Sequence, residues 1–188
     1  MKLEKIIAYH YTNEEVLNSI NNGTMYGKLG LIPIKRFISL GKGHNLPDEA
    51  FDGVVQALLE PEPKSWTENS EFPRLWGYLM HDICRRDKVI LLSFEIMPQD
   101  KAYVVERAYI EQELYREFKT GKAPTNRQND NAYLKYWNSR VLVFQYRGNY
   151  KLPQLAIWTT ITCDRIKIEW VKQTEDIWQR CLDNKWIA

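Results

Sequence analysis

Short apolar runs separated by polar residues predict small strands and helices in mixed order along this chain. Residues 6–9 are a β-favouring run and should form the first strand. Thr12 and Glu15 then have the form of a capping box, so we expect a helix that ends at Gly23. A second strand is expected at residues 37–40.

The rest of the chain continues this alternation of apolar runs and breaks. Residues 89–96 are the clearest strand, and a turn at residues 97–100 predicts a hairpin with a partner strand at residues 102–105. We expect loops at residues 60–73 and, most clearly, at residues 121–131. The remaining elements are a helix start at residues 47–49, helices at residues 75–83, 109–119, 132–137 and 174–182, and strands at residues 141–146, 155–161 and 166–171.

Helices and strands without regular βαβ repetition indicate an α+β fold with a split, mainly antiparallel sheet and flanking helices. A length of 188 residues is typical of one domain, which we expect to span residues 1–188. A chain of this length buries roughly 70% of its unfolded surface, so neither a disulfide nor a metal is needed for stability.

Composition and charge restrict the class of protein only coarsely. Hydrophobic residues make up 44% and charged residues 27%, which excludes a disordered tail, a collagen-like fibre and a small disulfide scaffold. A net charge of +2 and a pI near 8.3 do not support nucleic-acid binding, although they allow a local basic face. The three cysteines form no CxxC motif, and we expect reduced, mostly buried thiols. No apolar run has the length of a signal peptide or a membrane span, so we expect a cytoplasmic protein without a membrane partner.

Few segments have the spacing of a chemical motif. Residues 23–28 are one residue too short between the glycines for a phosphate loop, and a hairpin-type turn explains them better. His10, His44 and His81 lack metal-type spacing, so no metal site is expected. The informative segment is residues 10–12, because the N-terminus of the following helix attracts anions and ligand oxygens. Taken alone, His10 is better explained by a hydrogen bond within the core.

The opening of the chain resembles that of ADP-ribosyltransferases, which begin with a strand ending in His and a helix ending in an Ile-x-x-Gly pattern. The matching segments are Tyr9-His10-Tyr11-Thr12, then Ser19-Ile20-Asn21-Asn22-Gly23, and Arg36-Phe37-Ile38-Ser39. The similarity is greatest to the DarT-like group, toxins that modify a nucleobase in DNA. Residues 51–66 and 89–92 match the family's middle region loosely. Residues 152–158 and 161–166 resemble the strand that carries its catalytic glutamate.

The resemblance implies that NAD binds in the cleft between the halves of the sheet. His10 would bond a ribose hydroxyl of NAD, Thr12 would help to hold the cofactor, and backbone groups beside Tyr11 would hold the nicotinamide amide. The family's other expected contacts are Arg36 on the diphosphate or the acceptor, Tyr26 or Phe37 stacked on the nicotinamide, and Ser39 in the cofactor-binding set.

The sequence differs from the family at the catalytic position, where it has Gln154 in place of the family's glutamate. An amide can bond a ribose hydroxyl but carries no charge to stabilise the cationic sugar, so the reaction should slow by roughly two to three orders of magnitude or more. Three explanations account for this glutamine. The strand can be misaligned with that of the family, the protein can be a naturally inactive or repurposed member, or it can be a toxin copy that was disabled so that it could be produced. Glu106 is the alternative carboxylate, although a solvent-facing pair with Arg107 explains it better.

The leading hypothesis is therefore an NAD-dependent ADP-ribosyltransferase-like toxin with nucleic acid as its acceptor. The family also implies an antitoxin or chaperone partner. The alternatives are a non-catalytic member that binds NAD, a nucleotide or a protein, and a generic α+β enzyme in which His10 has no connection with NAD. A single-strand nucleic-acid groove and a solvated basic face both account for the basic residues near Trp66 and Trp76, which are Lys64, Arg74, Arg85, Arg86 and Lys88.

Overall fold

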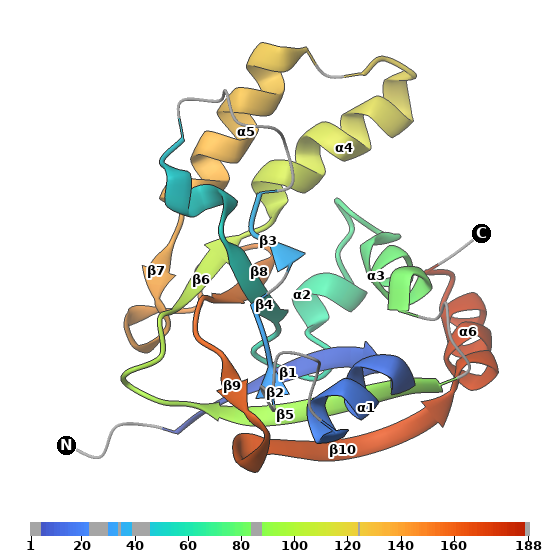
Figure 1. Ribbon diagram of the computed structural model, residues 1–188. Helices are drawn as coiled ribbons and strands as arrows, with labels where there is room; N and C mark the ends of the chain where they lie inside the picture. Colours follow the sequence, from blue (N-terminus) through green and yellow to red (C-terminus); the bar gives the residue numbers. More distant parts are fainter. Residues whose placement is uncertain are drawn as a thin grey trace. The chain divides into compact units, whose positions relative to one another are not determined.

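A computed structural model describes residues 5–22, 30–33, 35–38, 46–83, 88–123 and 125–186. The chain divides into two compact units, each assembled from segments that are separate in the sequence. Figure 1 colours the chain by residue number. Unit 1 comprises Met1–Ile32, Ala57–Pro98 and Thr160–Ala188, and unit 2 comprises Pro33–Gln56 and Gln99–Thr159. The expectation of a single domain over residues 1–188 stays a prediction.

Unit 1 is built on a three-stranded sheet in the order β1 (Ile6–Asn13), β5 (Lys88–Ile96) and β10 (Ile166–Gln173). Both pairings are antiparallel, and β5 is the central strand. Its residues from Val89 to Phe94 are all buried, because a central strand covered on both faces needs apolar side chains on both. The run of β-branched and leucine residues that predicted this strand therefore reflects its central position.

A second, two-stranded pairing in unit 1 joins β2 (Gly30–Leu31) to β9 (Ile161–Thr162). Gly30 has a φ of 134°, and a Cβ at this position would lie 2.1 Å from the carbonyl oxygen of Ile161. Only glycine fits so close an approach of two backbones. The described residues of this unit also form four α-helices: α1 (Glu14–Asn22), α2 (Lys64–Thr67), α3 (Leu75–Ile83) and α6 (Thr174–Asp183).

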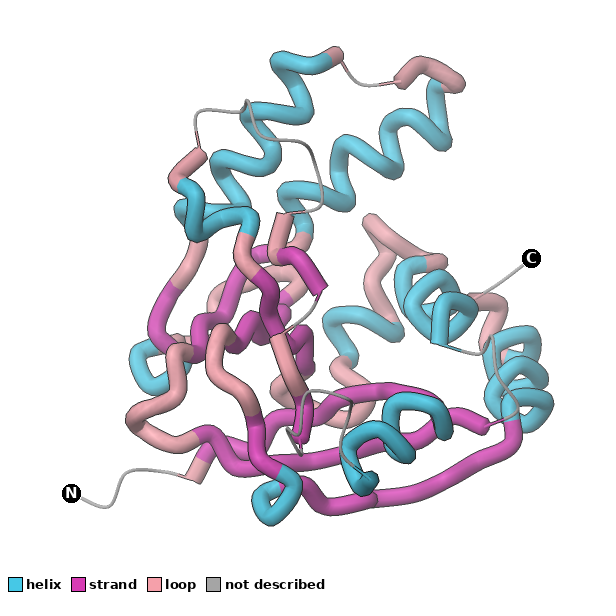
Figure 2. The backbone as a smooth tube through the Cα atoms, in the orientation of Figure 1, coloured by secondary structure: helices cyan, strands magenta, loops and turns pink. Residues whose placement is uncertain are grey.

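Unit 2 is built on a five-stranded sheet, drawn with its helices in Figure 2. The strand order is β3 (Lys35–Arg36), β4 (Gly53–Ala57), β8 (Pro153–Ile157), β6 (Ala102–Glu106) and β7 (Val141–Leu142). Two helices, α4 (Ala108–Thr120) and α5 (Asn126–Asn138), pack against each other. Their buried side chains and one face of the sheet form a core that includes Phe37, Val105, Tyr136, Trp137 and Ala156.

The structure confirms the coarse prediction of an α+β fold with antiparallel pairing, and the residues that it describes form six α-helices. The helix expected at residues 75–83 is α3 with the same bounds, and the strand expected at residues 89–96 is β5. The helix start expected at residues 47–49 is a single 3-10 turn, Asp48–Phe51. Short local patterns were sufficient for these elements because each contains its own start or stop signal.

The hairpin expected between residues 89–96 and 102–105 is wrong. β6 forms where it was expected, but it pairs with β8 and β7 rather than with β5. The turn at residues 97–100 therefore connects strands of two different sheets. Strand pairing is decided by partners that are distant in sequence, so the short turn was a misleading signal.

Three local expectations are also corrected. Residues 121–131 are not all loop, because Thr125 and Gln128 form a capping box that starts α5. The first helix is capped by Asn13 rather than Thr12: Oδ1 of Asn13 accepts the N–H of Val16 at 3.2 Å. Phe37 and Ile38 are buried but lie outside any strand, whereas Ser39, Leu40 and Gly23 lie outside the described residues.

Candidate functional site

β1 carries three of the expected cofactor-binding residues in unit 1. His10 lies opposite Leu92 of β5, Tyr11 opposite Leu91 and Thr12 opposite Ile90. Because side chains alternate along a strand, His10 and Thr12 share one face of the sheet and Tyr11 lies on the other. His10 is half-buried and lies inside the strand rather than at its exit, whereas Thr12 is buried. The expected role of Tyr11 involved only neighbouring backbone groups, so this alternation does not conflict with it.

The face of β1 that carries Tyr11 supports an aromatic cluster, which consists of Tyr11, Trp76, Trp170 and Trp186. Tyr11 meets Trp76 edge-on with ring centres 5.6 Å apart, and meets Trp170 edge-on at 5.7 Å. Trp186 meets Trp76 at 6.3 Å and donates its indole N–H to the carbonyl of Thr67 at 2.9 Å. Such edge-on contacts are favourable between rings, and the cluster ties α3 and the turn after α6 to the sheet.

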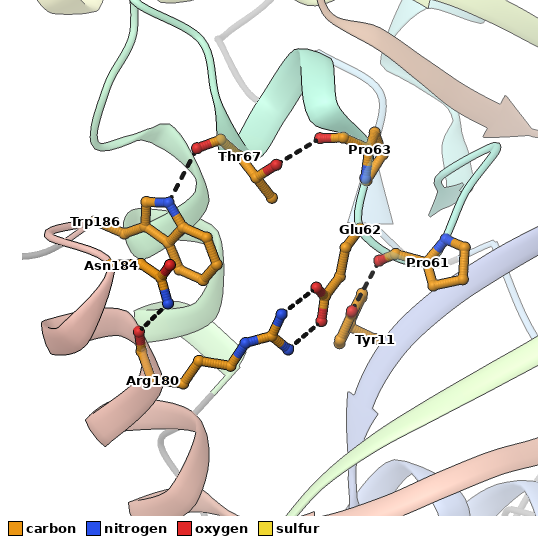
Figure 3. Close-up of polar contacts among 8 residues, drawn as sticks. All are labelled: Tyr11, Pro61, Glu62, Pro63, Thr67, Arg180, Asn184 and Trp186. Atoms are coloured by element: carbon orange, nitrogen blue, oxygen red, sulfur yellow. Dashed lines mark hydrogen bonds and ion pairs between the residues drawn. The ribbon is translucent and has the colours of Figure 1, made fainter.

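An ion pair between Arg180 and Glu62 borders the aromatic cluster, and Figure 3 shows this pair with Tyr11 and Trp186. The two terminal guanidinium nitrogens of Arg180 each donate to one carboxylate oxygen of Glu62 at 2.5 Å. The Tyr11 hydroxyl donates to the carbonyl of Pro61 at 2.8 Å, and burial raises its pKa. The cavity left among these side chains has a volume of about 10 Å³. This is the space of one water molecule, so the cluster is a packed core with a polar cap.

In unit 2, Gln154 lies on β8 opposite Val105 and is buried. Its Oε1 accepts a hydrogen bond of 3.0 Å from the hydroxyl of Tyr136, which is itself fully buried. Phe37 stacks on the Tyr136 ring with centres 4.6 Å apart and planes 10° apart. Tyr136 therefore joins two of the expected site residues, Gln154 through its hydroxyl and Phe37 through its ring.

The environment of Tyr136 is partly ionic. Burial raises its pKa to about 12, and a hydrogen bond and the charge of Arg107 oppose that rise. Nε of Arg107 donates to Glu111 at 2.6 Å, one turn along the chain. Burial lowers the pKa of Arg107, but the charge of Glu111, its hydrogen bond to Arg107, and Tyr136 and Tyr133 together raise that pKa above its ordinary value. The hydroxyl of Tyr136 therefore donates a hydrogen bond to Gln154, and its oxygen also interacts with the guanidinium of Arg107.

Glu106 is not the solvent-facing partner of Arg107 that its sequence context suggested. Its side chain is buried, and its carboxylate accepts three backbone N–H groups: Lys151 at 2.7 Å, Leu152 at 2.9 Å and Ala108 at 3.2 Å. A carboxylate that accepts several backbone N–H groups fixes the turns that present them. Glu106 thus secures both the start of α4 and the entry to β8.

The expected site residues lie in both units. His10, Tyr11 and Thr12 belong to unit 1, and Gln154, Glu106 and Phe37 to unit 2. Phe37 is covered by Tyr136, Trp137 and Trp158, so its ring is a core group rather than an exposed surface for the nicotinamide. The backbone of Arg36 forms β3, whereas its side chain, Tyr26 and Ser39 lie outside the described residues.

The proposed nucleic-acid groove loses its stacking surfaces. Trp66 and Trp76 are 4% and 2% exposed, so neither ring is accessible to a base. Nζ of Lys88 pairs with Glu14 at 2.5 Å, whereas Arg85 and Arg86 lie outside the described residues. A basic face over an apolar underside is the better description of the segment.

Other kinds of site find little support in the part of the chain that the structure describes. Among these residues no group of three or more histidine, cysteine or acidic side chains could hold a metal ion. Likewise, none of the described helices is long and apolar enough to span a membrane. Cys163 and Cys181 are free thiols, and burial raises the pKa of Cys181. The thiol of Cys181 is therefore a core group.

Sequence reasoning missed Tyr136, its contact with Arg107, and the pair of Glu62 with Arg180. Each becomes significant through a partner that is distant in sequence or on another element, and no local spacing marks it. Sequence reasoning also missed the capping box at Thr125. This feature does have a local signal, because a systematic search for Thr-x-x-Gln would have found it.

Comparison of the chain with protein-family models, with curated proteins and with solved structures found no match. The resemblance to ADP-ribosyltransferases therefore rests on the residues of this chain alone.

Proposed function

We propose that the protein binds NAD in the manner of an ADP-ribosyltransferase and turns the cofactor over slowly or not at all. The observation that supports the binding of NAD is the placement of His10 and Thr12 on one face of β1, directly before α1. The resemblance expects a histidine on the first strand and a helix immediately after it. A half-buried imidazole on that strand is able to bond a ribose hydroxyl.

The proposal of slow turnover rests on the two candidate catalytic side chains of unit 2. Gln154 has no charge, and its Oε1 is already bonded to Tyr136. Glu106 has a charge, but three backbone N–H groups occupy its carboxylate. Cleavage of the glycosidic bond of NAD builds positive charge on the ribose, and a carboxylate in a dry site is the group that stabilises it. Neither residue is suited to that role.

The acceptor and the partner are inferred from the resemblance alone. A nucleic-acid acceptor and an antitoxin or chaperone follow from the DarT-like family, and no described contact adds support to them. The non-catalytic alternative, a protein that binds NAD or another nucleotide, has the advantage that it requires no carboxylate at position 154.

Thermal unfolding in the presence of NAD tests the binding proposal. At about 100 times the dissociation constant, a ligand that binds only the folded chain stabilises it by ~2.7 kcal/mol. We expect this shift in the unaltered protein and in His81→Ala, which removes an exposed histidine from α3. The shift should vanish in His10→Ala, with each variant compared with its own unfolding midpoint without NAD.

Two results would contradict the proposal. If the unaltered protein shows no NAD-dependent shift, the generic α+β enzyme is the better hypothesis. If His10→Ala keeps the full shift, NAD binds elsewhere and the resemblance of β1 to the family is coincidental.

A further inference from the structure

β10 combines an open hydrogen-bonding edge with exposed apolar side chains. In the sheet order β1-β5-β10 it has a partner on one side only among the described strands. Ile168 and Val171 on this strand are 46% and 48% exposed. An edge strand presents unpaired backbone N–H and C=O groups, which are a template for another strand. Figure 1 shows β10 along the border of the sheet of unit 1.

The opposite border of the same sheet is partly closed by the chain itself. Tyr9 of β1 exchanges two backbone hydrogen bonds with Leu58, at 2.9 Å and 2.8 Å. No such bridge reaches the outer side of β10 from the residues that the structure describes. Among the residues that the structure describes, the sheet is therefore partly closed at β1 and open at β10.

The charges on β10 indicate which partner the edge accepts. Lys167 and Glu169 flank Ile168 and lie 3.1 Å apart, with side chains 73% and 29% exposed. The hydroxyl of Ser93 donates to Glu169 at 2.5 Å, and this bond together with Lys167 lowers the pKa of the carboxylate. Glu169 is therefore ionised at neutral pH and held beside the lysine.

Lysines on an edge strand oppose pairing with strands that offer no negative charge. A second copy of β10 offers that charge in one antiparallel register. If a two-fold axis passes through Ile168, then Lys167 of each copy lies opposite Glu169 of the other, and the two Ile168 side chains meet. Opposite charges directly across a pair of strands are favourable, and an isologous contact doubles each interaction.

We propose that two copies of the chain associate through antiparallel pairing of β10, centred on Ile168. The two three-stranded sheets then form one continuous sheet of six strands, a common size. The register of β10 on β5 shifts between Ile168 and Trp170, which marks a β-bulge. A bulge increases local twist and restricts regular pairing to a short segment. The interface of the dimer is therefore small, and the fraction of dimer depends on the protein concentration.

Charge reversal at the two sites provides a direct test by sedimentation velocity over a range of protein concentrations. The unaltered chain should approach twice the mass of one 22.4 kDa chain. Lys167→Glu and Glu169→Lys each place like charges across the interface, so each should associate about tenfold more weakly or not at all. Lys122→Glu changes an exposed lysine in unit 2 by the same charge and should leave association unaltered.

An equimolar mixture of the two single variants is the decisive measurement. Opposite charges face each other again in the mixed pair, so the mixture should form the dimer that neither variant forms alone. Its recovery also shows that both variants are folded. A mixture that stays monomeric, a monomeric unaltered chain at every concentration, or a dimer indifferent to both substitutions would each overturn the proposal.

Discussion

The hydroxyl of Tyr136 donates a 3.0 Å hydrogen bond to Oε1 of Gln154, and both side chains are buried. This bond connects α5 to β8 inside the core of unit 2. It also supplies Gln154 with a specific structural role, which is independent of any contact with a cofactor. A glutamine at this position is therefore explained by the local packing, whether or not NAD binds.

We expect Tyr136→Phe to lower the free energy of unfolding by about 1–2 kcal/mol, because the buried oxygen of Gln154 loses its donor. Gln154→Leu should cost a similar amount by leaving the Tyr136 hydroxyl without its acceptor. The double variant should be less destabilised than the sum of the two, because it removes both polar groups. Urea denaturation of all four forms measures the coupling, and strictly additive effects would show that the bond contributes nothing.

The pKa of Tyr136 predicts how stability falls at alkaline pH. Burial raises this pKa from 10.0 to about 12, so the hydroxyl ionises at a lower pH in the unfolded chain than in the folded one. Its contribution to stability is complete below pH 10 and is lost as the pH rises toward about 12. Unfolding free energies measured at about pH 9 and pH 11 should differ less for Tyr136→Phe than for the unaltered protein. An equal difference in both would contradict the assignment.

Glu106→Ala should destabilise the protein by about 3 kcal/mol or more, because three buried or partly buried backbone N–H groups lose their side-chain acceptor. Glu68→Ala, at an exposed position after α2, is the control and should change stability by less than about 0.5 kcal/mol. Thermal unfolding compares the two. If both substitutions prove equally mild, Glu106 does not hold the turns around it.

Thr125→Ala should cost about 1 kcal/mol of stability, because it removes the hydroxyl that accepts the N–H of Gln128 in the capping box at the start of α5. Thr125→Ser keeps the hydroxyl and should retain most of the stability. Denaturant midpoints and helical circular dichroism report the effect. A serine variant as unstable as the alanine variant would show that the methyl group, rather than the cap, is responsible.

Gln154→Glu should increase the release of nicotinamide from NAD by about a hundredfold or more if position 154 lies against the ribose. Gln154→Leu is the matched control, since it occupies the site without a polar group. Release is measured by chromatography after incubation with NAD. Binding without release in either variant would favour the non-catalytic function, whereas equal release in both would remove position 154 from the reaction.

The success of the sequence predictions depended on whether an element carries its own signals. The helix at residues 75–83 and the strand at residues 89–96 have an apolar pattern that is sufficient locally. The pairing of β6 was wrong because β8, its true neighbour, lies about fifty residues further along the chain. A split sheet was expected, but the assignment of β5 and β6 to different sheets depends on partner strands that are distant in sequence.

The candidate site was less predictable than the fold. The apolar residues 6–9 predicted the first strand, but that strand continues to Asn13, so His10 lies inside it and not at its exit. By contrast, the environment of Glu106 is created by N–H groups at residues 151 and 152, and no spacing around residue 106 indicates them. Burial and polar partners of a single side chain are products of tertiary structure.

The order of strands in unit 1 has a consequence for synthesis on the ribosome. The apolar strand β5 receives one neighbour, β1, from residues made before it, and the other, β10, only from residues near the end. The longer segment of unit 2, Gln99–Thr159, is translated between β5 and β10. During that interval the nascent chain holds an unfinished, aggregation-prone sheet, so chaperone demand should be greatest just before the last strand emerges.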